Sequence, residues 1–201
     1  MANIAVLGYG TVGSGVVDVL ELNRDIIAQR AKEEINVKYV LDLRDFPGDK
    51  VEKMLVHDFE IIVNDDEVDI VAEVLGGVKF AYPYVKAALE SGKSVVTSNK
   101  ELVAKYGAEL LAIAKEKNVN FFFEASVGGG IPIIRPLNEC LTAEEICEIT
   151  GILNGTTNYI LTKMSKEGLD FGTVLKDAQD KGYAERNPEA DVEGYDACRK
   201  I

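Results

Sequence analysis

Two patterns of apolar and polar residues alternate along the first part of the chain. Short apolar runs give way to longer stretches in which apolar residues recur at helical spacing. Apolar runs of this kind are typical of strands buried on both faces of a parallel sheet. The predicted strands cover residues 3–7, 37–43, 69–74, 93–97 and 118–124. The predicted helices run from residue 12 past residue 30, over 83–91, over 101–117 and onward from about residue 132.

This order of strands and helices predicts an α/β fold with a doubly wound parallel sheet. Residues 47–68 are polar and irregular, so we expect no regular element there and place His57 on the surface. The pattern changes near residue 140, which predicts a first domain over residues 1–140 and a second region over residues 141–201.

The second region mixes strand and helix signals. A strand is expected over residues 145–153, and Asn154 is expected to cap the helix that follows. The other predicted helices cover residues 171–181, closed by Gly182, and a last segment that starts at Val192 with Asp191 as its cap.

A glycine-rich turn, Gly8-Tyr-Gly-Thr-Val-Gly13, joins the first predicted strand to the first predicted helix. Glycines in this context permit a tight turn and a close approach of the backbone to a pyrophosphate. The N–H groups at the start of the helix would then face that anion. The turn predicts a dinucleotide site, and the alternative is a glycine-rich turn without a ligand.

The end of the second predicted strand carries conflicting signals about the cofactor. Asp42 or Asp45 could bind the ribose hydroxyls of NAD, whereas Arg44 could meet the extra phosphate of NADP. Both cofactors therefore stay open, and a polar loop without either role is the simpler alternative.

Later strand ends add further candidate groups, because open α/β sheets bind ligands at the carboxyl ends of their strands. Gly76 and Gly77 follow the third strand, and Lys100 follows the fourth. Glu124 precedes a loop with three glycines, whose carbonyl oxygens and carboxylate suit a hard cation. The alternatives are a simple turn at Gly76 and Gly77, a solvated lysine at Lys100 and a mobile loop after Glu124.

Asp196 and Lys200 lie four residues apart near the end of the chain, and Glu185 lies upstream. On a helix this spacing places the acid and the amine on one face. Such a pair could hold a zwitterion and transfer a proton. An ordinary surface ion pair is the alternative.

Composition narrows the classes of function. The net charge is −12, which disfavours nucleic acid, and no apolar run approaches the length of a membrane span. Three cysteines without a CxxC pair suit a reducing cytoplasm, and the N-terminus shows no signal peptide. One histidine supplies too little imidazole for common zinc sites or a Ser-His-Asp triad.

Six segments of the chain occur together, in this order, in one known family. They are GYGTVGSGV, VLGG, TSNKELVA, EASVGGGIPII, GILNGTTNYIL and GYAERNPEADVEGYDACRK. Together they closely resemble homoserine dehydrogenases and spread over nearly the whole chain. The resemblance implies a Rossmann-type nucleotide domain, followed by an incomplete α+β substrate and dimerisation domain. It also implies NAD(P)-dependent, reversible reduction of L-aspartate 4-semialdehyde to L-homoserine, which leads to threonine, isoleucine and methionine.

The resemblance also assigns roles to individual residues. Lys200 matches the proton donor, Lys100 would lie near nicotinamide and substrate, and Glu185 and Asp196 would hold the substrate's amino group. Residues expected at the dinucleotide are Gly8, Tyr9, Gly10, Thr11, Val12, Gly13, Arg44, Ser98, Lys100, Gly182 and Glu185. A monovalent cation site, usually for sodium, is matched by Glu124 and the carbonyl oxygens of Val127, Gly129 and Ile131.

Members of this family, usually homodimers, continue well beyond the position that Ile201 matches. We therefore expect a fragment, and the alternative function is a dinucleotide-binding module without catalysis. The neighbouring aspartate-semialdehyde dehydrogenases need a nucleophilic cysteine and a histidine base. Neither Cys140 nor Cys147 lies in a recognisable nucleophile turn, so this reading is disfavoured.

Overall fold

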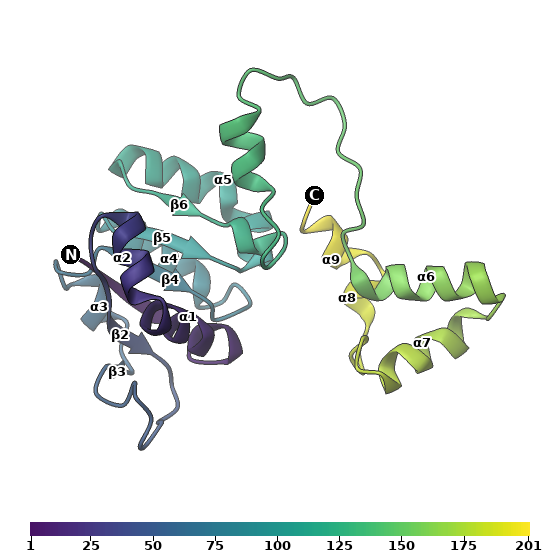
Figure 1. Cartoon of the computed structure of the whole chain (residues 1–201), viewed down its shortest axis with the longest axis horizontal. Coiled ribbons are helices and arrows are strands. Elements are labelled where there is room, and N and C mark those ends of the chain that lie inside the picture. Colours follow the sequence, from purple (N-terminus) through teal and green to yellow (C-terminus); the bar gives the residue numbers. More distant parts are fainter. The chain divides into compact units, whose positions relative to one another are not determined.

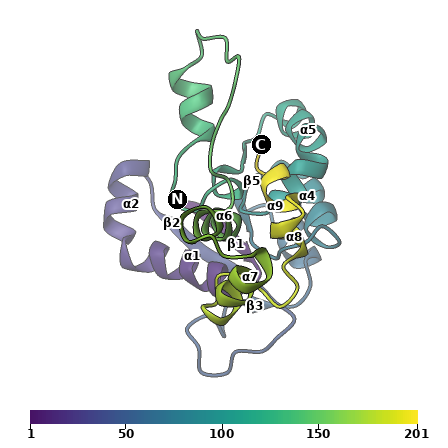
Figure 2. The same cartoon turned by 90° about the vertical axis from the view of Figure 1, so that its right-hand side faces the viewer.

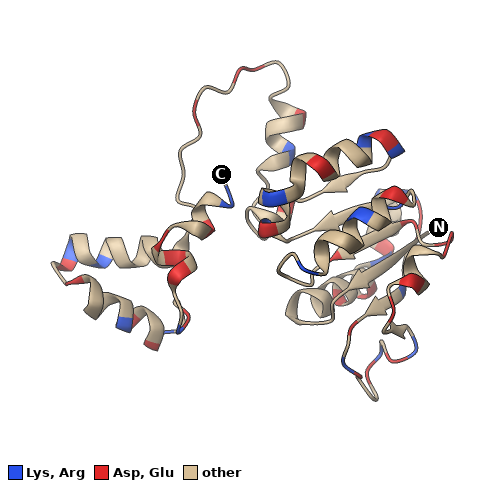
Figure 3. Ribbon diagram, turned by 180° about the vertical axis from the view of Figure 1, so that it is seen from behind, with Lys and Arg blue, Asp and Glu red and all other residues tan.

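The computed structural model describes residues 1–201 as two compact units, Met1–Asn138 and Glu139–Ile201 (Figure 1). The first unit contains a parallel sheet and its covering helices, and the second contains helices only. Figure 3 shows acidic positions on helices of both units, in keeping with 34 acidic and 22 basic residues. None of the helices combines the length and apolar character needed to cross a bilayer.

The first unit is built on a parallel sheet with the order β3-β2-β1-β4-β5-β6. Its strands are β1 Ala2–Leu7, β2 Ile35–Leu41, β3 Leu55–Val56, β4 Ile70–Glu73, β5 Ser94–Thr97 and β6 Phe121–Phe122. Strand order changes direction between β1 and β4, so the carboxyl ends of these two strands flank the crevice where such sheets bind ligands. The predicted doubly wound α/β fold is confirmed.

Helices cover both faces of the sheet, as Figure 2 shows for α1 and α2 on one side and α4 and α5 on the other. The helices of this unit are α1 Thr11–Leu22, α2 Arg24–Ala31, α3 Glu60–Val63, α4 Ala81–Glu90 and α5 Lys100–Lys117. Successive residues of β1 point to opposite faces of the sheet. Leu7 belongs to the same buried cluster as Leu102 and Leu110 of α5. Val6 belongs to the cluster on the other face, with Val17 of α1. Burying each such aliphatic side chain contributes about 1.5–3 kcal/mol.

Several element boundaries differ from the predictions. The first helix was expected to be continuous, but it breaks at Asn23, whose side chain and backbone N–H both donate to Val19 O. The region expected to be irregular contains the short elements β3 and α3, because Phe59 and Ile62 are buried there. Elements of two to four residues are too short to show a period.

The last strand, β6, is shorter than residues 118–124. Asn118 adopts a left-handed conformation with φ of 55° as the C-cap of α5, so the strand cannot start there. Beyond β6 the chain enters a 3₁₀ turn, Glu124–Ser126. The helix expected near residue 132 begins at residue 134 and continues as a π-type turn, Pro136–Cys140.

The second unit has a small core of Ile160, Val174, Ala178 and Ala184. Its helices are α6 Gly155–Glu167, α7 Phe171–Asp180, α8 Glu189–Val192 and α9 Tyr195–Cys198. The strand predicted at residues 145–153 is wrong, since this segment has no regular structure. A strand needs a neighbour to pair with, and this unit has no strand.

The last predicted helix is also wrong in its start. Gly194, with φ of 79°, separates α8 from α9, so the segment forms two short helices. Asp191 lies inside α8 and does not cap a helix at Val192.

Candidate functional site

The glycine turn between β1 and α1 depends on two of its glycines. Gly8 has φ of 100°, and a Cβ atom there would lie 3.2 Å from Val74 O. A Cβ atom on Gly13 would lie 1.9 Å from Gly8 O, which no side chain can tolerate. The turn therefore brings α1 as close to β1 as backbone allows. The first turn of α1 has no acidic residue, so its N–H groups suit an anion.

Tyr9 contributes backbone to this turn, while its ring is part of the core. The side chain is buried, and its hydroxyl donates to Asp49 Oδ1 at 3.0 Å. Burial, and then the hydrogen bond to Asp49, raise the pKa of Tyr9. Thr11 and Val12, at the start of α1, remain exposed.

Asp42 and Arg44 form one unit beside the glycine turn. Asp42 accepts the Tyr9 N–H at 2.8 Å and both the Nε and Nη2 groups of Arg44 at 2.9 Å. Nη2 of Arg44 also donates to Tyr9 O at 3.1 Å. Hydrogen bonds from Arg44 hold the pKa of Asp42 well below its usual range. Asp42 is thus already occupied, whereas the side chain of Arg44 is 61% exposed.

The remaining polar groups at this strand end pair with each other. His57 is exposed as expected, with Nδ1 2.6 Å from Asp42 O and Nε2 3.1 Å from Asp45 Oδ1. A pocket of about 400 Å³ lies alongside and is lined by Leu41, Asp42, Leu43, Arg44, His57, Leu75, Phe80 and Tyr84. Its size and mixed lining suit an aromatic ring with a polar substituent.

The ends of β4 and β5 supply the next candidates. Gly76 and Gly77 both have positive φ, at 78° and 63°. Ser98 lines an apolar pocket of about 580 Å³ that also includes Val12. Lys100 is the first residue of α5, after the cap residue Asn99, whose Oδ1 accepts the Leu102 N–H at 3.0 Å.

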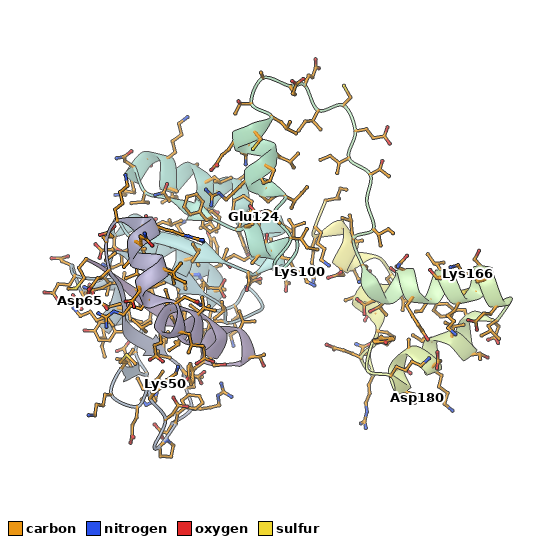
Figure 4. The ribbon with its side chains drawn as sticks, viewed as in Figure 1. Lys50, Asp65, Lys100, Glu124, Lys166 and Asp180 are labelled. Atoms are coloured by element: carbon orange, nitrogen blue, oxygen red, sulfur yellow. The ribbon has the colours of Figure 1, made fainter.

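Glu124 is the first residue of the 3₁₀ turn that follows β6, and Figure 4 labels it together with Lys100. Its carboxylate accepts backbone N–H groups from Ile133, from Ile134 at 2.9 Å and from Arg135 at 2.8 Å. These bonds, that of Ile133 first, lower the pKa of Glu124. The carboxylate therefore caps the helix that starts at residue 134, a role that the sequence did not suggest.

The expected carbonyl ligands Val127, Gly129 and Ile131 lie in the loop between Glu124 and this helix. No group of three or more acidic, histidine or cysteine side chains is arranged to hold a metal. A site built from carbonyl oxygens and one carboxylate stays a prediction.

In the second unit, Asp196 and Lys200 meet as their spacing predicted. Lys200 Nζ lies 2.8 Å from Asp196 Oδ2 and donates to Leu153 O at 2.8 Å. The Asp196 side chain is 6% exposed and that of Lys200 is 19% exposed. Burial at this level keeps the pair in a fixed geometry, which distinguishes it from a mobile surface ion pair.

Asn154 is a member of this cluster that the sequence did not identify. Its Nδ2 donates to Asp196 Oδ2 at 2.8 Å and to Asp191 Oδ1 at 2.7 Å. Its Oδ1 accepts the Thr157 N–H at 2.8 Å, which confirms Asn154 as the cap of α6. Partners 37 and 42 residues away leave no spacing signal in the sequence.

Gly182 and Glu185 lie on the exposed turn after α7. Gly182 has φ of 76°, and Glu185 is fixed through its backbone oxygen, which accepts from Gln179 Nε2 at 3.0 Å. The structure places the Glu185 side chain in solvent, and its role in binding a ligand stays a prediction.

Known proteins resemble this chain over nearly its full length. Family models described as "Homoserine dehydrogenase, NAD binding domain" and "Homoserine dehydrogenase" match residues 8–124 and 132–201. A Bacillus subtilis homoserine dehydrogenase is 46% identical over 98% of this chain and 46% of its own length. The chain thus spans about half the length of the curated relatives it matches.

Solved structures agree with the sequence matches. A homoserine dehydrogenase from Thiobacillus denitrificans is 46% identical, with a TM-score of 0.89 over 99% of this chain and 47% of its own. A hyperthermophilic archaeal homoserine dehydrogenase in complex with NADPH is 32% identical, with a TM-score of 0.85 over 99% of this chain and 67% of its own. Both family models and these structures lead to one conclusion: the chain belongs to the homoserine dehydrogenase family.

Proposed function

We propose that this chain contributes the dinucleotide site and the substrate groups for NAD(P)-dependent reduction of L-aspartate 4-semialdehyde to L-homoserine. The Asp196–Lys200 pair, fixed by Asn154 and Leu153 O, is the observation that carries the proposal. An ammonium group held beside a buried carboxylate suits a reaction that develops negative charge on an aldehyde oxygen.

The glycine turn fits a bound dinucleotide, because Gly8 and Gly13 allow α1 to start directly against β1 and the β4 loop, which leaves the N–H groups at the start of α1 available to a pyrophosphate. The bound nicotinamide supplies the hydride. Arg44 presents an exposed guanidinium above an Asp42 that is already occupied, which favours a phosphorylated adenosine ribose. We therefore propose NADP as the preferred cofactor. The NADPH-bound archaeal relative is compatible with this preference.

Lys200 acts on the substrate's carbonyl oxygen. During reduction its ammonium group stabilises the growing charge on the carbonyl oxygen and then donates a proton to it. Asp196, with Glu185, provides the carboxylates that suit the substrate's amino group. Lys100 is proposed to lie near nicotinamide and substrate, at the carboxyl end of β5.

Finer features of the family remain proposals for this chain. These are a cytoplasmic homodimer, a sodium ion held by Glu124 with the carbonyls of Val127, Gly129 and Ile131, and a place in threonine, methionine and isoleucine biosynthesis. The acidic surface supports a small-molecule enzyme over a nucleic-acid-binding protein.

The test is a turnover assay on the folded chain, following NADPH and NADH absorbance with L-aspartate 4-semialdehyde. Lys200→Ala should lower kcat by about 10²–10⁴ while NADPH binding is retained, since it removes the proton donor. Lys166→Ala, an exposed lysine of α6, is the matched control. Full activity in Lys200→Ala would refute the assignment. Binding of NADPH without turnover in the unaltered chain would favour the non-catalytic alternative.

A further inference from the structure

A continuous series of hydrogen bonds joins the ends of two neighbouring strands. Glu73 ends β4 and Thr97 ends β5, and the two residues are paired in register. Glu73 is fully buried, and its carboxylate accepts the Leu75 N–H at 2.9 Å and the Thr97 hydroxyl at 2.5 Å. Two hydrogen bonds to one buried acid fix both strand ends against each other.

Asn99 extends this series to both loops. Its N–H donates to Thr97 Oγ1 at 2.9 Å, so the single hydroxyl proton of Thr97 is directed toward Glu73. The Asn99 side chain is 7% exposed and uses both of its ends. Oδ1 accepts the Leu102 N–H at the start of α5, and Nδ2 donates to Gly77 O at 2.5 Å.

The loop that Asn99 contacts has little restraint of its own. Gly76 and Gly77 are exposed and both have positive φ, and no atom lies within 4 Å of the position of a Cβ on either residue. Glycine has the widest conformational freedom of all residues, so two in succession need an external contact to stay ordered. The same loop packs against the nucleotide turn, since a Cβ on Gly8 would lie 3.3 Å from Leu75 Cδ2.

We infer that Asn99 is a positioning residue that holds the Gly76–Gly77 loop and the start of α5 as one rigid edge for the dinucleotide. The inference rests on the proposed function. A cap for α5 could be provided equally by Asp or Ser. Of these capping residues, only asparagine adds an N–H donor that reaches Gly77 O. Replacing Asn99 by Asp or Ser therefore tests the bond to Gly77 O while the cap of α5 is kept.

Two substitutions in the full chain separate the hydrogen bond to Gly77 O from the cap of α5. Asn99→Asp and Asn99→Ser keep an oxygen that can cap α5 but remove the donor to Gly77 O. Asn120→Asp adds the same charge at an exposed position at the opposite end of the sheet and serves as the control. The three readouts are the melting temperature, the amide hydrogen exchange of residues 74–80 and the Kd for NADPH from fluorescence titration.

We expect both Asn99 variants to exchange about tenfold faster in residues 74–80 and to bind NADPH about five- to tenfold more weakly, as for the loss of one hydrogen bond. Asn120→Asp should match the unaltered chain. Equal exchange and equal Kd in the Asn99 variants would overturn the inference and leave Asn99 as a cap only. A melting temperature about 10 °C lower in both variants would also overturn it, because the hydrogen bond from Asn99 to Gly77 O would then stabilise the whole fold and not the loop alone.

The proposed function can fail separately. If the unaltered chain does not bind NADPH, both the cofactor part of the proposed function and the role of Asn99 within it are overturned. If the unaltered chain binds NADPH and the Asn99 variants bind equally well, only the inference about Asn99 fails.

Discussion

The two units hold their candidate groups by different means. In the first unit, buried clusters of 16 and 7 residues support a six-stranded sheet, and the candidate groups lie at strand ends and helix starts. In the second unit the buried cluster has 4 residues, and polar side chains far apart in sequence hold the candidate pair. Backbone geometry thus fixes the glycine turn of the first unit, whereas a side-chain network fixes the candidate pair of the second.

This difference predicts how each unit responds to substitution. The glycine turn is made of backbone, so a substitution within it is harmful only where the new atom cannot fit. A site held by a few buried hydrogen bonds loses several contacts when one side chain is shortened. The substitutions below are ordered from the largest expected effect to the smallest.

Gly13→Ala should have the largest combined effect on stability and cofactor binding, because its Cβ would lie 1.9 Å from Gly8 O and would force the glycine turn open. We expect a loss of about 1–3 kcal/mol from overpacking and at least hundredfold weaker NADPH binding. Gly15→Ala is the matched control in the same helix, with no atom within 4 Å of its Cβ position. It should leave binding unchanged and stabilise α1 by about 0.5–1 kcal/mol. Equal behaviour of the two variants in urea titrations would refute the backbone account of this site.

Asn154→Ala should break the network of the second unit. It removes the cap of α6 and the donors to Asp191 and Asp196, at a cost of about 2–4 kcal/mol. Because the core of this unit is small, we expect faster hydrogen exchange throughout α6 and α7, with no change in the sheet of the first unit. Asn158→Ala, on the exposed side of α6, should have no such effect. Equal exchange in both variants would mean that the network does not hold this unit together.

Arg44→Ala should change cofactor choice with little effect on stability. Loss of the guanidinium removes the charged partner of a ribose phosphate and frees Asp42 to accept ribose hydroxyls. We expect the Kd for NADPH to rise about 10–100-fold while that for NADH stays the same or falls. Arg24→Ala, an exposed arginine paired with Glu34, is the control. A parallel loss of both cofactors would contradict the proposed NADP preference.

Glu124→Gln should have the smallest effect, and that effect should depend on pH. The pKa of Glu124 is lowered in the folded chain, so its contribution is complete above the ordinary pKa of 4.5 and is lost as pH falls through the lower folded value. The difference in melting temperature between Glu124→Gln and the unaltered chain should therefore be constant near neutral pH and shrink below about pH 4.5. A difference that grows on acidification would refute the capping role.

Sequence patterns predicted the first unit well because its elements repeat a signal along the chain. Strand, glycine turn and helix each have a local pattern, and Gly8 and Gly13 occupy the positions where only glycine fits. The conflict between Asp42 and Arg44 could not be resolved from sequence, because it depends on which group already binds the other. The cap formed by Glu124 was also missed, since the residues it binds follow a loop of irregular structure.

The second unit was predicted less well, because the contacts that hold its candidate pair join residues far apart in the sequence. The Asp196–Lys200 pair follows from local helical spacing and was found. Asn154 and Asp191 meet across 37 residues, so no local pattern indicates their contact. The strand expected at residues 145–153 has the apolar composition of a strand, but composition alone cannot supply the neighbour that a strand requires.

That segment has a consequence for the behaviour of the protein in solution. Ile146, Ile149 and Ile152 are 46%, 52% and 76% exposed on a stretch with no strand partner. Such stretches promote association between chains, whereas interspersed acids such as Glu148 and a net charge of −12 oppose it. Acidification neutralises those carboxylates and leaves the isoleucines in place. Colloidal stability should therefore be lowest near pH 4.6, where the net charge passes through zero, and should recover below it as the 22 basic residues give a positive charge. Surface charge, which opposes association of chains, is thus as important to the behaviour of this protein in solution as its core is to its fold.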